Sequence, residues 1–311
     1  MATATQTSHD RLDATAVFIL VALCAVWALG QTAIKIANTG ISPLLQAGLR
    51  SIGSAILLAL WCRWRGKPLL LRDGTLILGI VAGILFTLEF VFIYQGLQFT
   101  SASRSALFVN TSPFVVAIGA HWLVPGERIT RVKLLGLALA FAGVAIAFQD
   151  SLALPTRHEI IGDLLCLAGA VAWGATTVVV KATGLARIGA ERALLYQLVV
   201  SAIVLPLLSL QLREPGIFNP APMVLAALGF QIVVIAFVSY TIWYWLIAHY
   251  PASRVTPFGF LTPIFGIAFG AWLLQEHVST ALLVALAMIA SGIYLVNRPQ
   301  SRAAPVPTQS I

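Results

Sequence analysis

The amino-acid sequence predicts an all-α integral membrane protein, with ten transmembrane helices in two inverted five-helix repeats around a central cavity. Three observations lead to this prediction: the composition, the number of long apolar runs, and a pattern that occurs twice. Apolar residues make up 59% of the chain and charged residues only 10%, whereas soluble domains have roughly 45–50% and about 25%. A soluble core could not hide so much apolar surface, so lipid is the expected solvent.

Long apolar runs follow one another along most of the chain. Each is close to the ~20 residues that a helix needs to cross the hydrocarbon of a bilayer. Short links rich in glycine, proline or charged residues separate them, so we expect each run to form one helix. The runs are approximately 15–37, 43–62, 75–97, 102–123, 131–149, 160–180, 190–210, 222–246, 252–274 and 279–296.

The two ends of the chain differ from its apolar middle. Residues 1–14 are polar and lack the cationic start and cleavage site of a secretory signal peptide, so the first run is expected to stay as a helix. Residues 297–311 are rich in proline, serine and alanine, which predicts a disordered tail. Between them we expect a first repeat over 15–149, a linker over 150–159 and a second repeat over 160–296.

A pattern of Ala, Ser, Arg, Pro and Trp recurs after 150 positions, and it relates Arg104 to Arg254 and Pro113 to Pro263. Such self-similarity indicates two copies of one structural unit. Each copy has five spans, an odd number, so the second copy must cross the bilayer in the opposite sense. Inverted copies can exchange inward-open and outward-open conformations of similar energy around one site. The repeat therefore predicts a transporter.

The basic residues predict the orientation of the chain. With the N-terminus inside, 14 of the 19 lysines and arginines fall in cytoplasmic segments or at their helix ends, which places both termini in the cytoplasm. The net charge of +8 is modest, and no stripe of basic residues interleaves with aromatic ones. The expected partners are therefore a lipid bilayer and a small-molecule substrate, and not a nucleic acid.

Glu89 is the sharpest candidate for a substrate contact, because it lies well inside the third run. A carboxylate at that depth costs at least ~2–3 kcal/mol, so it should face the bundle interior or a wet cavity. It either takes up a proton, binds a substrate ammonium, or forms a structural pair with a basic or backbone group.

Aromatic residues form the second group of candidates. Trp27 and Trp173 are related by an offset of 146 and lie mid-span, whereas interfacial tryptophans lie near helix ends. Together with Tyr240, Trp243 and Tyr244 they either form a flat cavity wall, suited to aromatic or cationic substrates, or pack against neighbouring helices.

Other polar residues lie within or near the same runs. Tyr94 occupies the matched position to Tyr244, ten residues before the repeated arginine, and is also a cavity candidate. Gln31, Asn110 and Thr177 either line the cavity or bridge helices.

Basic residues near the spans are candidates for gating. Lys35 and Lys181, eight residues after the paired tryptophans, either reach the membrane interface or pair with an acid to form a gate. Arg50 either pairs with Glu89 or binds a carboxylate. The repeated Arg104 and Arg254 are either interfacial anchors or gates at helix ends.

Pro113 and Pro263 should interrupt matched helices near their middles, because proline removes one backbone hydrogen bond. Ser112 and Thr262 stand beside them to satisfy the freed carbonyls. The kinks are either bending points for gating or static. By contrast, the fifth and tenth runs carry small residues at every fourth position, which favours close helix packing within the fold or between protomers.

Nothing in the sequence indicates an enzyme, a cofactor or a metal site. The three cysteines lie in apolar runs and suggest buried small side chains rather than a disulfide framework. No phosphate-binding loop, zinc-protease helix or nucleophile elbow is present in the sequence.

Several of these residues are also the ones that resemble a known family. The run 94–102, the step Ser112-Pro113 and the turn 126–130 are similar to the EamA-type branch of the drug/metabolite transporter superfamily, and Thr262-Pro263 with 275–279 form a looser second copy. The resemblance covers about residues 15–297 and implies ten helices in two inverted repeats with a central cavity. Within that branch the chain is similar to a bacterial exporter of aromatic amino acids and some toxic cations.

The sequence thus predicts a secondary transporter of the bacterial cytoplasmic membrane that exports small metabolites by alternating access, with amino acids, aromatic ones especially, as the favoured cargo. The alternatives are an uncoupled facilitator, an exporter of cationic drugs or other metabolites, and, from a different class, an intramembrane enzyme. A monomer and a homodimer both remain open.

Overall fold

The computed structural model describes residues 12–68, 73–149, 155–274 and 280–298, with the backbone alone described at 102–103 and 270–274. Apart from one isolated bridge between Ile41 and Ile217, the regular structure of these ranges is helical. The predicted tails, part of the predicted linker and the motif at 275–279 lie wholly or largely outside the described residues.

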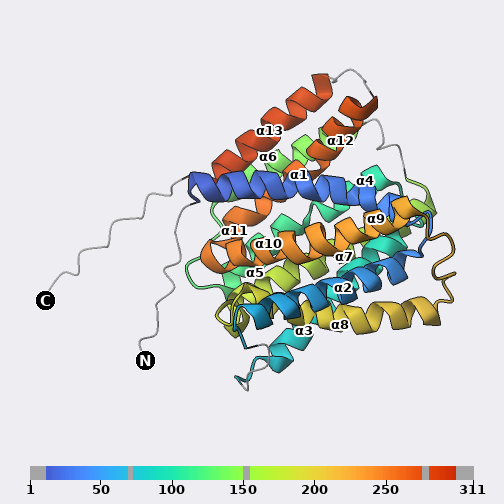
Figure 1. Cartoon of the computed structure of the whole chain (residues 1–311). Helices are drawn as coiled ribbons and strands as arrows, with labels where there is room; N and C mark the ends of the chain where they lie inside the picture. Colours follow the sequence, from blue (N-terminus) through green and yellow to red (C-terminus); the bar gives the residue numbers. More distant parts are fainter. Residues whose placement is uncertain (1–11, 69–72, 150–154, 275–279, 299–311) are drawn as a thin grey trace, which may run out of the picture.

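The elements of the first half are α1 (Ala14–Ala37), α2 (Pro43–Trp64), α3 (Leu76–Gly96), α4 (Ala102–Val109), α5 (Ser112–Leu123) and α6 (Arg131–Ala147). The elements of the second half are α7 (Arg157–Ala182), η2 (Gly184–Ala186), α8 (Ala190–Gln211), α9 (Pro222–Phe230), the π-helical η3 (Gln231–Ser239), α10 (Tyr240–His249), α11 (Ala252–Val255), the 3₁₀-helical η4 (Thr256–Phe260), α12 (Leu261–Leu274) and α13 (Thr280–Asn297). The start of α1 and the end of α13 lie at the same end of the molecule (Figure 1).

Eight segments of the described chain are long and apolar enough to cross a membrane. The two remaining predicted runs are α6, which has 17 residues and is about 25 Å long, and the segment formed by α11, η4 and α12. The protein is therefore all-helical with eight candidate membrane spans, and the arrangement of ten helices in two inverted repeats stays a prediction.

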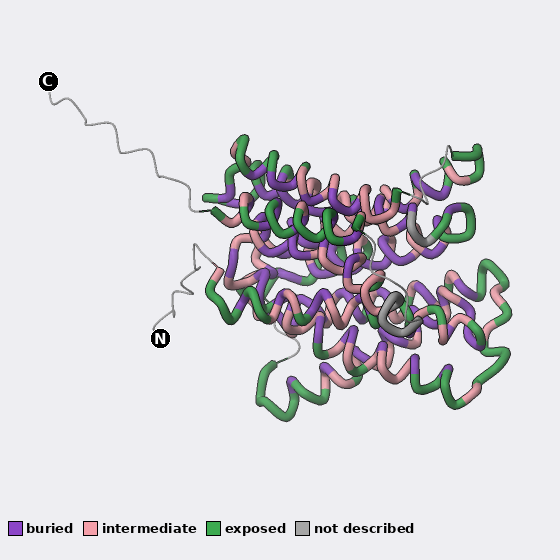
Figure 2. Tube along the Cα trace, turned by 90° about the horizontal axis from the view of Figure 1, so that it is seen from above, coloured by how far each residue is buried: buried purple, intermediate pink, exposed green. Residues whose placement is uncertain are grey.

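The outer surface of these helices is apolar. Phe18, Ile77 and Leu210 are each about three-quarters exposed, at 74%, 74% and 75%. Buried residues lie where helices face one another, and exposed ones lie along outer sides and at helix ends (Figure 2). Water would penalise such a surface at roughly 25 cal/mol per Å², whereas hydrocarbon would not.

The fourth predicted run is broken in front of Pro113. Proline has no N–H to donate to the carbonyl four residues earlier, and α4 ends at that residue, Val109. The amide of Asn110 donates to the carbonyl of Ala106 at 2.7 Å, and the hydroxyl of Thr111 donates to that of Phe108 at 2.6 Å. These two side chains, rather than the expected Ser112, satisfy carbonyls of the last turn of α4.

The ninth predicted run changes in the same place relative to its proline. The chain is 3₁₀-helical over η4, and Pro263 then lies in the first turn of α12. Both prolines therefore stand just after a change in helix geometry, and neither lies inside a continuous α-helix as the sequence suggested. An N–H is not required in the first turn of a helix, so proline is tolerated there.

Helices α6 and α13 pack along each other through small residues. A Cβ atom built on Gly136 would lie 2.7 Å from the carbonyl oxygen of Gly292, and one on Gly143 would lie 2.8 Å from that of Ala285. Backbone atoms cannot move aside as a flexible side chain can. The small residues of the fifth and tenth runs therefore serve packing within the fold.

Replacing Gly143 by valine is expected to destabilise the protein by about 1–3 kcal/mol, because the added side chain must push α6 and α13 apart. Thermal unfolding in detergent, followed by tryptophan fluorescence, measures this effect. Ala138→Val on the exposed face of the same helix is the matched control. Equal melting temperatures for the two variants would contradict the packing argument.

The remaining helices pack in two groups. In the first bundle, α3, α4 and α5 pack on α7; in the second bundle, α1 packs on α9, η3, η4 and α12. The segments α10 and α11 are continuous in sequence with the second bundle. Helices α2 and α8 pair with each other, as do α6 and α13.

Candidate functional site

A cluster of buried polar groups lies between α2 and α3. Arg50 of α2 is only 1% exposed, and its guanidinium carbon lies 4.2 Å from the centre of the Phe90 ring. Glu89 and Tyr94 of α3 are also buried. In the described part of the chain, Nε and Nη2 of Arg50, Oε2 of Glu89 and the hydroxyl of Tyr94 have no hydrogen-bond partner.

Arg50 and Glu89 interact electrostatically, but they do not form an ion pair. The ion pairs found among the described residues are at other places, such as Lys67 with Glu191 and Arg192 with Asp73. Buried polar atoms without partners are rare in native structures because leaving them unpaired is costly. Water or a ligand with complementary charges and donors would satisfy these atoms.

Trp27 lies at the centre of an aromatic group that joins the two bundles. Its ring centre is 6.4 Å from that of Trp173, 6.5 Å from that of Tyr240 and 5.1 Å from that of Trp243, each with edge-to-face geometry. The indole N–H donates to the hydroxyl of Ser239 at 2.9 Å. The two tryptophans related by the repeat thus meet where the bundles face each other.

Further rings connect this aromatic group to the buried charges. Tyr240 lies 6.0 Å from Phe86, which lies 5.0 Å from Phe90, the ring that Arg50 covers. The rings are largely or partly buried. A series of edge-to-face ring contacts therefore links Trp27 to the polar cluster.

The other polar candidates do not join the cluster by a direct contact. Tyr244 is buried, and its hydroxyl donates to Oε1 of Gln197 on α8 at 2.5 Å, so it bridges helices. Asn110 bonds within its own helix turn. Thr177 is buried at 1% exposure on α7, whereas Gln31 is exposed on α1.

The two lysines of the repeat have different surroundings. The ammonium of Lys181 donates to the carbonyls of Ile247 and Tyr250, at 2.7 and 2.8 Å. It therefore caps the end of α10. Lys35, in the last turn of α1, is exposed.

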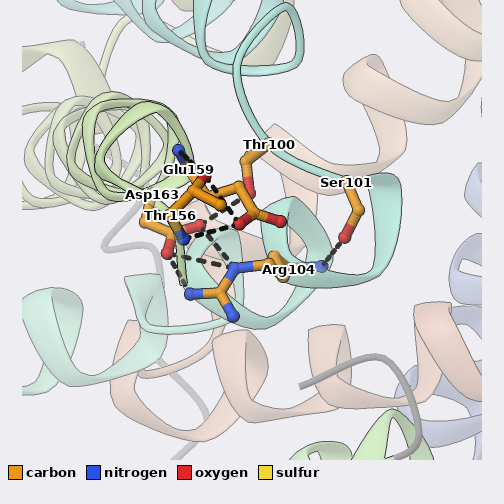
Figure 3. A network of polar contacts seen from close by, with 6 residues as sticks. All are labelled: Thr100, Ser101, Arg104, Thr156, Glu159 and Asp163. Carbon is orange, nitrogen blue, oxygen red and sulfur yellow. Dashed lines mark hydrogen bonds and ion pairs between the residues drawn. The ribbon is translucent and has the colours of Figure 1, made fainter. Parts of the chain in front are cut away.

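Arg104 is buried and forms an ion pair with Asp163, so it is not a lipid-facing anchor. Figure 3 shows its guanidinium extending from α4 to the carboxylate on α7, where Nε lies 3.2 Å from each carboxylate oxygen. The hydroxyl of Thr100 donates to the same carboxylate at 2.7 Å. Thr156 and Glu159 form a capping box at the start of α7, about two turns before Asp163. The network ties α4 to α7 within the first bundle.

Sequence reasoning did not identify three groups in these contacts: Asp163, Ser239 and Gln197. Asp163 is a lone acid within an apolar run, the same signal that singled out Glu89. Ser239 stands 150 positions after Glu89, but nothing in the sequence indicates that it accepts a bond from an indole. Among the described residues, no cluster of three or more His, Cys, Asp or Glu side chains could hold a metal ion.

Two groups outside the spans have shifted pKa values. The hydroxyl of Thr75 and the guanidinium of Arg192 hold the pKa of Asp73 at about 2, so this carboxylate stays ionised and ties the start of α8 to the link before α3. Burial, and then a hydrogen bond to Asp13, raises the pKa of Tyr250. That hydroxyl donates to Asp13 at 3.1 Å and joins the start of α1 to the end of α10.

Curated relatives of similar length cover most of this chain. An uncharacterized transporter, YvbV, of Bacillus subtilis is 29% identical over 280 residues, which are 90% of each chain. A probable amino-acid metabolite efflux pump of Escherichia coli is 27% identical over 87% of this chain and 90% of its own. One from Salmonella typhimurium is 29% identical over 89% and 93%.

A protein of known crystal structure has the same fold, with a TM-score of 0.77 at 18% identity, over 90% of this chain and 94% of its own. The sequence pattern of the EamA-like transporter family matches residues 14–149 and matches again at 160–298. The buried polar cluster and the two bundles that meet at Trp27 thus belong to a membrane transporter architecture, and this chain is a member of the EamA-like transporter family.

Proposed function

We propose that this protein is a secondary transporter that exports small zwitterionic metabolites, most favourably aromatic amino acids, from the bacterial cytoplasm. The observation that supports this cargo is the buried cluster of Arg50, Glu89 and Tyr94, in which two guanidinium nitrogens, one carboxylate oxygen and the hydroxyl lack partners within the described chain. A zwitterion brings a carboxylate for the guanidinium and an ammonium for Glu89. Each contact would be charge-assisted, and such hydrogen bonds contribute about 1.5–3 kcal/mol.

The series of aromatic rings next to the cluster supports an aromatic side chain on the cargo. The rings of Phe86 and Tyr240 lie between the buried charges and Trp27. Aromatic pairs in edge-to-face or offset geometry contribute about 0.5–1.5 kcal/mol beyond their area. Side chains of phenylalanine, tyrosine or tryptophan would make such pairs, whereas small hydrophilic side chains would not.

Alternating access is supported by the way the helices pair. The packing of α3 on α7 in the first bundle corresponds, under exchange of the two halves, to the packing of the α9–η3 span on α1 in the second. Helix pairs α2 with α8 and α6 with α13 each combine matched elements of the two halves. Two equivalent bundles inside a shared frame can rock about a site at their contact.

The names of two relatives support export as the direction of transport. The distribution of lysine and arginine supports an orientation with both termini in the cytoplasm. The proteins from E. coli and Salmonella are named as probable amino-acid metabolite efflux pumps. With both termini in the cytoplasm, the starts of α1 and α11 face the cell interior and the starts of α4 and α7 face outward. The proposed location is the bacterial cytoplasmic membrane.

Export of cationic drugs is the second candidate, because the aromatic group at Trp27 suits cation–π contacts. Arg50 argues against a purely cationic cargo, since a buried guanidinium near the site repels a second positive charge. The same cargo could also move through an uncoupled facilitator, in which Glu89 binds the ammonium but never exchanges a proton.

Uptake into liposomes that contain only this protein tests the proposal. The panel is labelled phenylalanine, its decarboxylated amine phenethylamine, a sugar and a quaternary ammonium ion. We expect phenylalanine to be transported much faster than the other three. Uptake of the quaternary ion but not of phenylalanine would favour the drug exporter, and uptake of none would overturn the proposed cargo class.

An imposed pH gradient separates proton coupling from facilitation. If Glu89 exchanges a proton during the cycle, a gradient should drive phenylalanine against its own concentration, and Glu89→Gln should abolish that accumulation. If transport only dissipates the substrate gradient in both proteins, the facilitator is the correct description.

A further inference from the structure

One carboxylate crosses from the first bundle to the second. Glu127, in the link after α5, is 7% exposed. Its two oxygens accept the backbone N–H groups of Ala252 and Ser253, each at 2.8 Å, at the start of α11. The first N–H groups of a helix have no partner within it, and they favour negative charge. Glu127 thus binds one bundle to the helix start of the other.

One ammonium crosses between the same bundles at the same end of the molecule. Lys181, at the end of α7, donates to the carbonyls of Ile247 and Tyr250 at the end of α10. The last carbonyls of a helix also lack partners and favour positive charge. The chain passes from α10 to α11 through Tyr250 and Pro251, so Glu127 and Lys181 hold the two sides of one turn.

The residues that match Lys181 and Thr177 in the first half lie at the other end of the molecule and are exposed. Residues 146 positions before Lys181 and Thr177 are Lys35 and Gln31. Lys35 is exposed and has no hydrogen-bond partner in the described chain, and Gln31 is exposed where Thr177 is 1% exposed. Gln31 and Lys35 follow Trp27 on α1 at intervals of four residues, and Thr177 and Lys181 follow Trp173 on α7 in the same way. The three residues of each helix therefore lie roughly along one helix face. Beyond the tryptophan contact, the face of α7 is covered and the face of α1 is not.

We propose that Glu127 and Lys181 form a latch, which we define as these two side chains with the helix ends that they cap, and that it holds the cytoplasmic end closed in this conformation. Lys35 is the counterpart, and it caps the end of α3 when the outer end closes instead. The carbonyls that match those of Ile247 and Tyr250, 150 positions earlier, belong to Leu97 and Thr100. This inference rests on the proposed alternating access, but not on the identity of the cargo.

The latch explains why the two lysines differ although the sequence repeats them. When two bundles rock about a site at their contact, closure of one end accompanies opening of the other. The lysine at the closed end therefore has its carbonyls, and the one at the open end does not. Exchange of one capped helix end for the other keeps the two conformations similar in energy, as a reversible cycle requires.

Cysteine labelling tests the latch without any substrate. The reporter is Ser253→Cys in a chain whose three native cysteines are replaced by alanine; Ser253 is 5% exposed under the latch. An impermeant maleimide is added to the cytoplasmic side in inverted membrane vesicles. We expect Lys181→Met to raise the labelling rate at least tenfold and Lys35→Met to lower it severalfold.

A second reporter separates gating from loosened packing. Gln31→Cys, labelled from the outer side, should react more slowly in the Lys181→Met background and faster in the Lys35→Met background. Lys181→Arg, which can still donate to carbonyls, should restore the parent rates. Faster labelling of both reporters in one variant would indicate local loosening and overturn the latch, as would unchanged rates. Because the labelling test contains no cargo, its result is independent of the transport test. The latch can be overturned while phenylalanine is transported, and the latch can be supported while phenylalanine is not transported.

Discussion

Replacing Asp163 by asparagine is expected to destabilise the protein by about 3–5 kcal/mol, because the change leaves the guanidinium of Arg104 buried without its counter-charge. Both side chains are less than one-tenth exposed, at 8% for Arg104 and 7% for Asp163. The substitution also disturbs the bond from Thr100 and weakens the tie between α4 and α7. Thermal unfolding of the purified protein in detergent, followed by fluorescence, measures the loss.

The double variant Arg104→Met with Asp163→Leu is the control for this prediction. It removes both charges and keeps apolar volume, so it should recover most of the stability that either single change loses. Arg192→Gln provides a comparison at a pair where the partner Asp73 is more exposed, at 27%, and should cost less. If Asp163→Asn melts with the parent protein, the pair contributes nothing to the fold.

Replacing Arg50 by glutamine is expected to reduce transport of phenylalanine roughly 100-fold, because the substrate carboxylate loses its charged donor in a buried site. The decarboxylated amine should gain relative to phenylalanine, since the repulsive guanidinium is absent. The ratio of the two initial rates in liposomes is the measurement. A change in this ratio identifies a specificity role that a general loss of folded protein would not produce.

Two further variants make this result specific to the site. Arg192→Gln removes another buried arginine, which pairs with Asp73 and lies outside the cluster, and should leave the ratio unchanged. Glu89→Gln should weaken phenylalanine and phenethylamine alike, because both have the ammonium. If Arg50→Gln lowers both rates equally, Arg50 has a structural role and the proposed carboxylate contact is wrong.

Local sequence patterns predict much of this helical architecture. Eight of the apolar runs correspond to helical segments of the described chain that could cross a membrane, since a membrane span must satisfy its backbone within itself and be apolar over its length. The internal repeat singled out Arg104, Pro113 and Lys181, because each has a copy at a constant offset. For the same reason it pointed to an interruption at each proline, although it named Ser112 for the carbonyls before Pro113, where Asn110 and Thr111 donate instead.

The partners of these residues were not predictable in the same way. Arg104 meets Asp163 from another helix, 59 positions away in the chain. Nothing in the run around Asp163 specifies which helix packs against it. Likewise, the bond from Trp27 to Ser239 joins residues 212 positions apart. Such contacts depend on how packed helices approach and rotate, and small residues such as Gly30, which faces Ile235 of η3, allow the close approach.

By itself, the sequence determined the helical membrane class and the positions that the two halves share, because composition, length and periodicity are local properties that lipid selects. Only the tertiary structure decided which of those shared positions form contacts with other helices. It placed Lys181 on the end of α10 and left its counterpart Lys35 exposed. It also buried Arg50 and Glu89, which have no copies in the other half, without an ion pair between them. The physical reason is that a helix end is capped only where another element packs against it, which depends on how the helices pack and not on the repeated residues themselves.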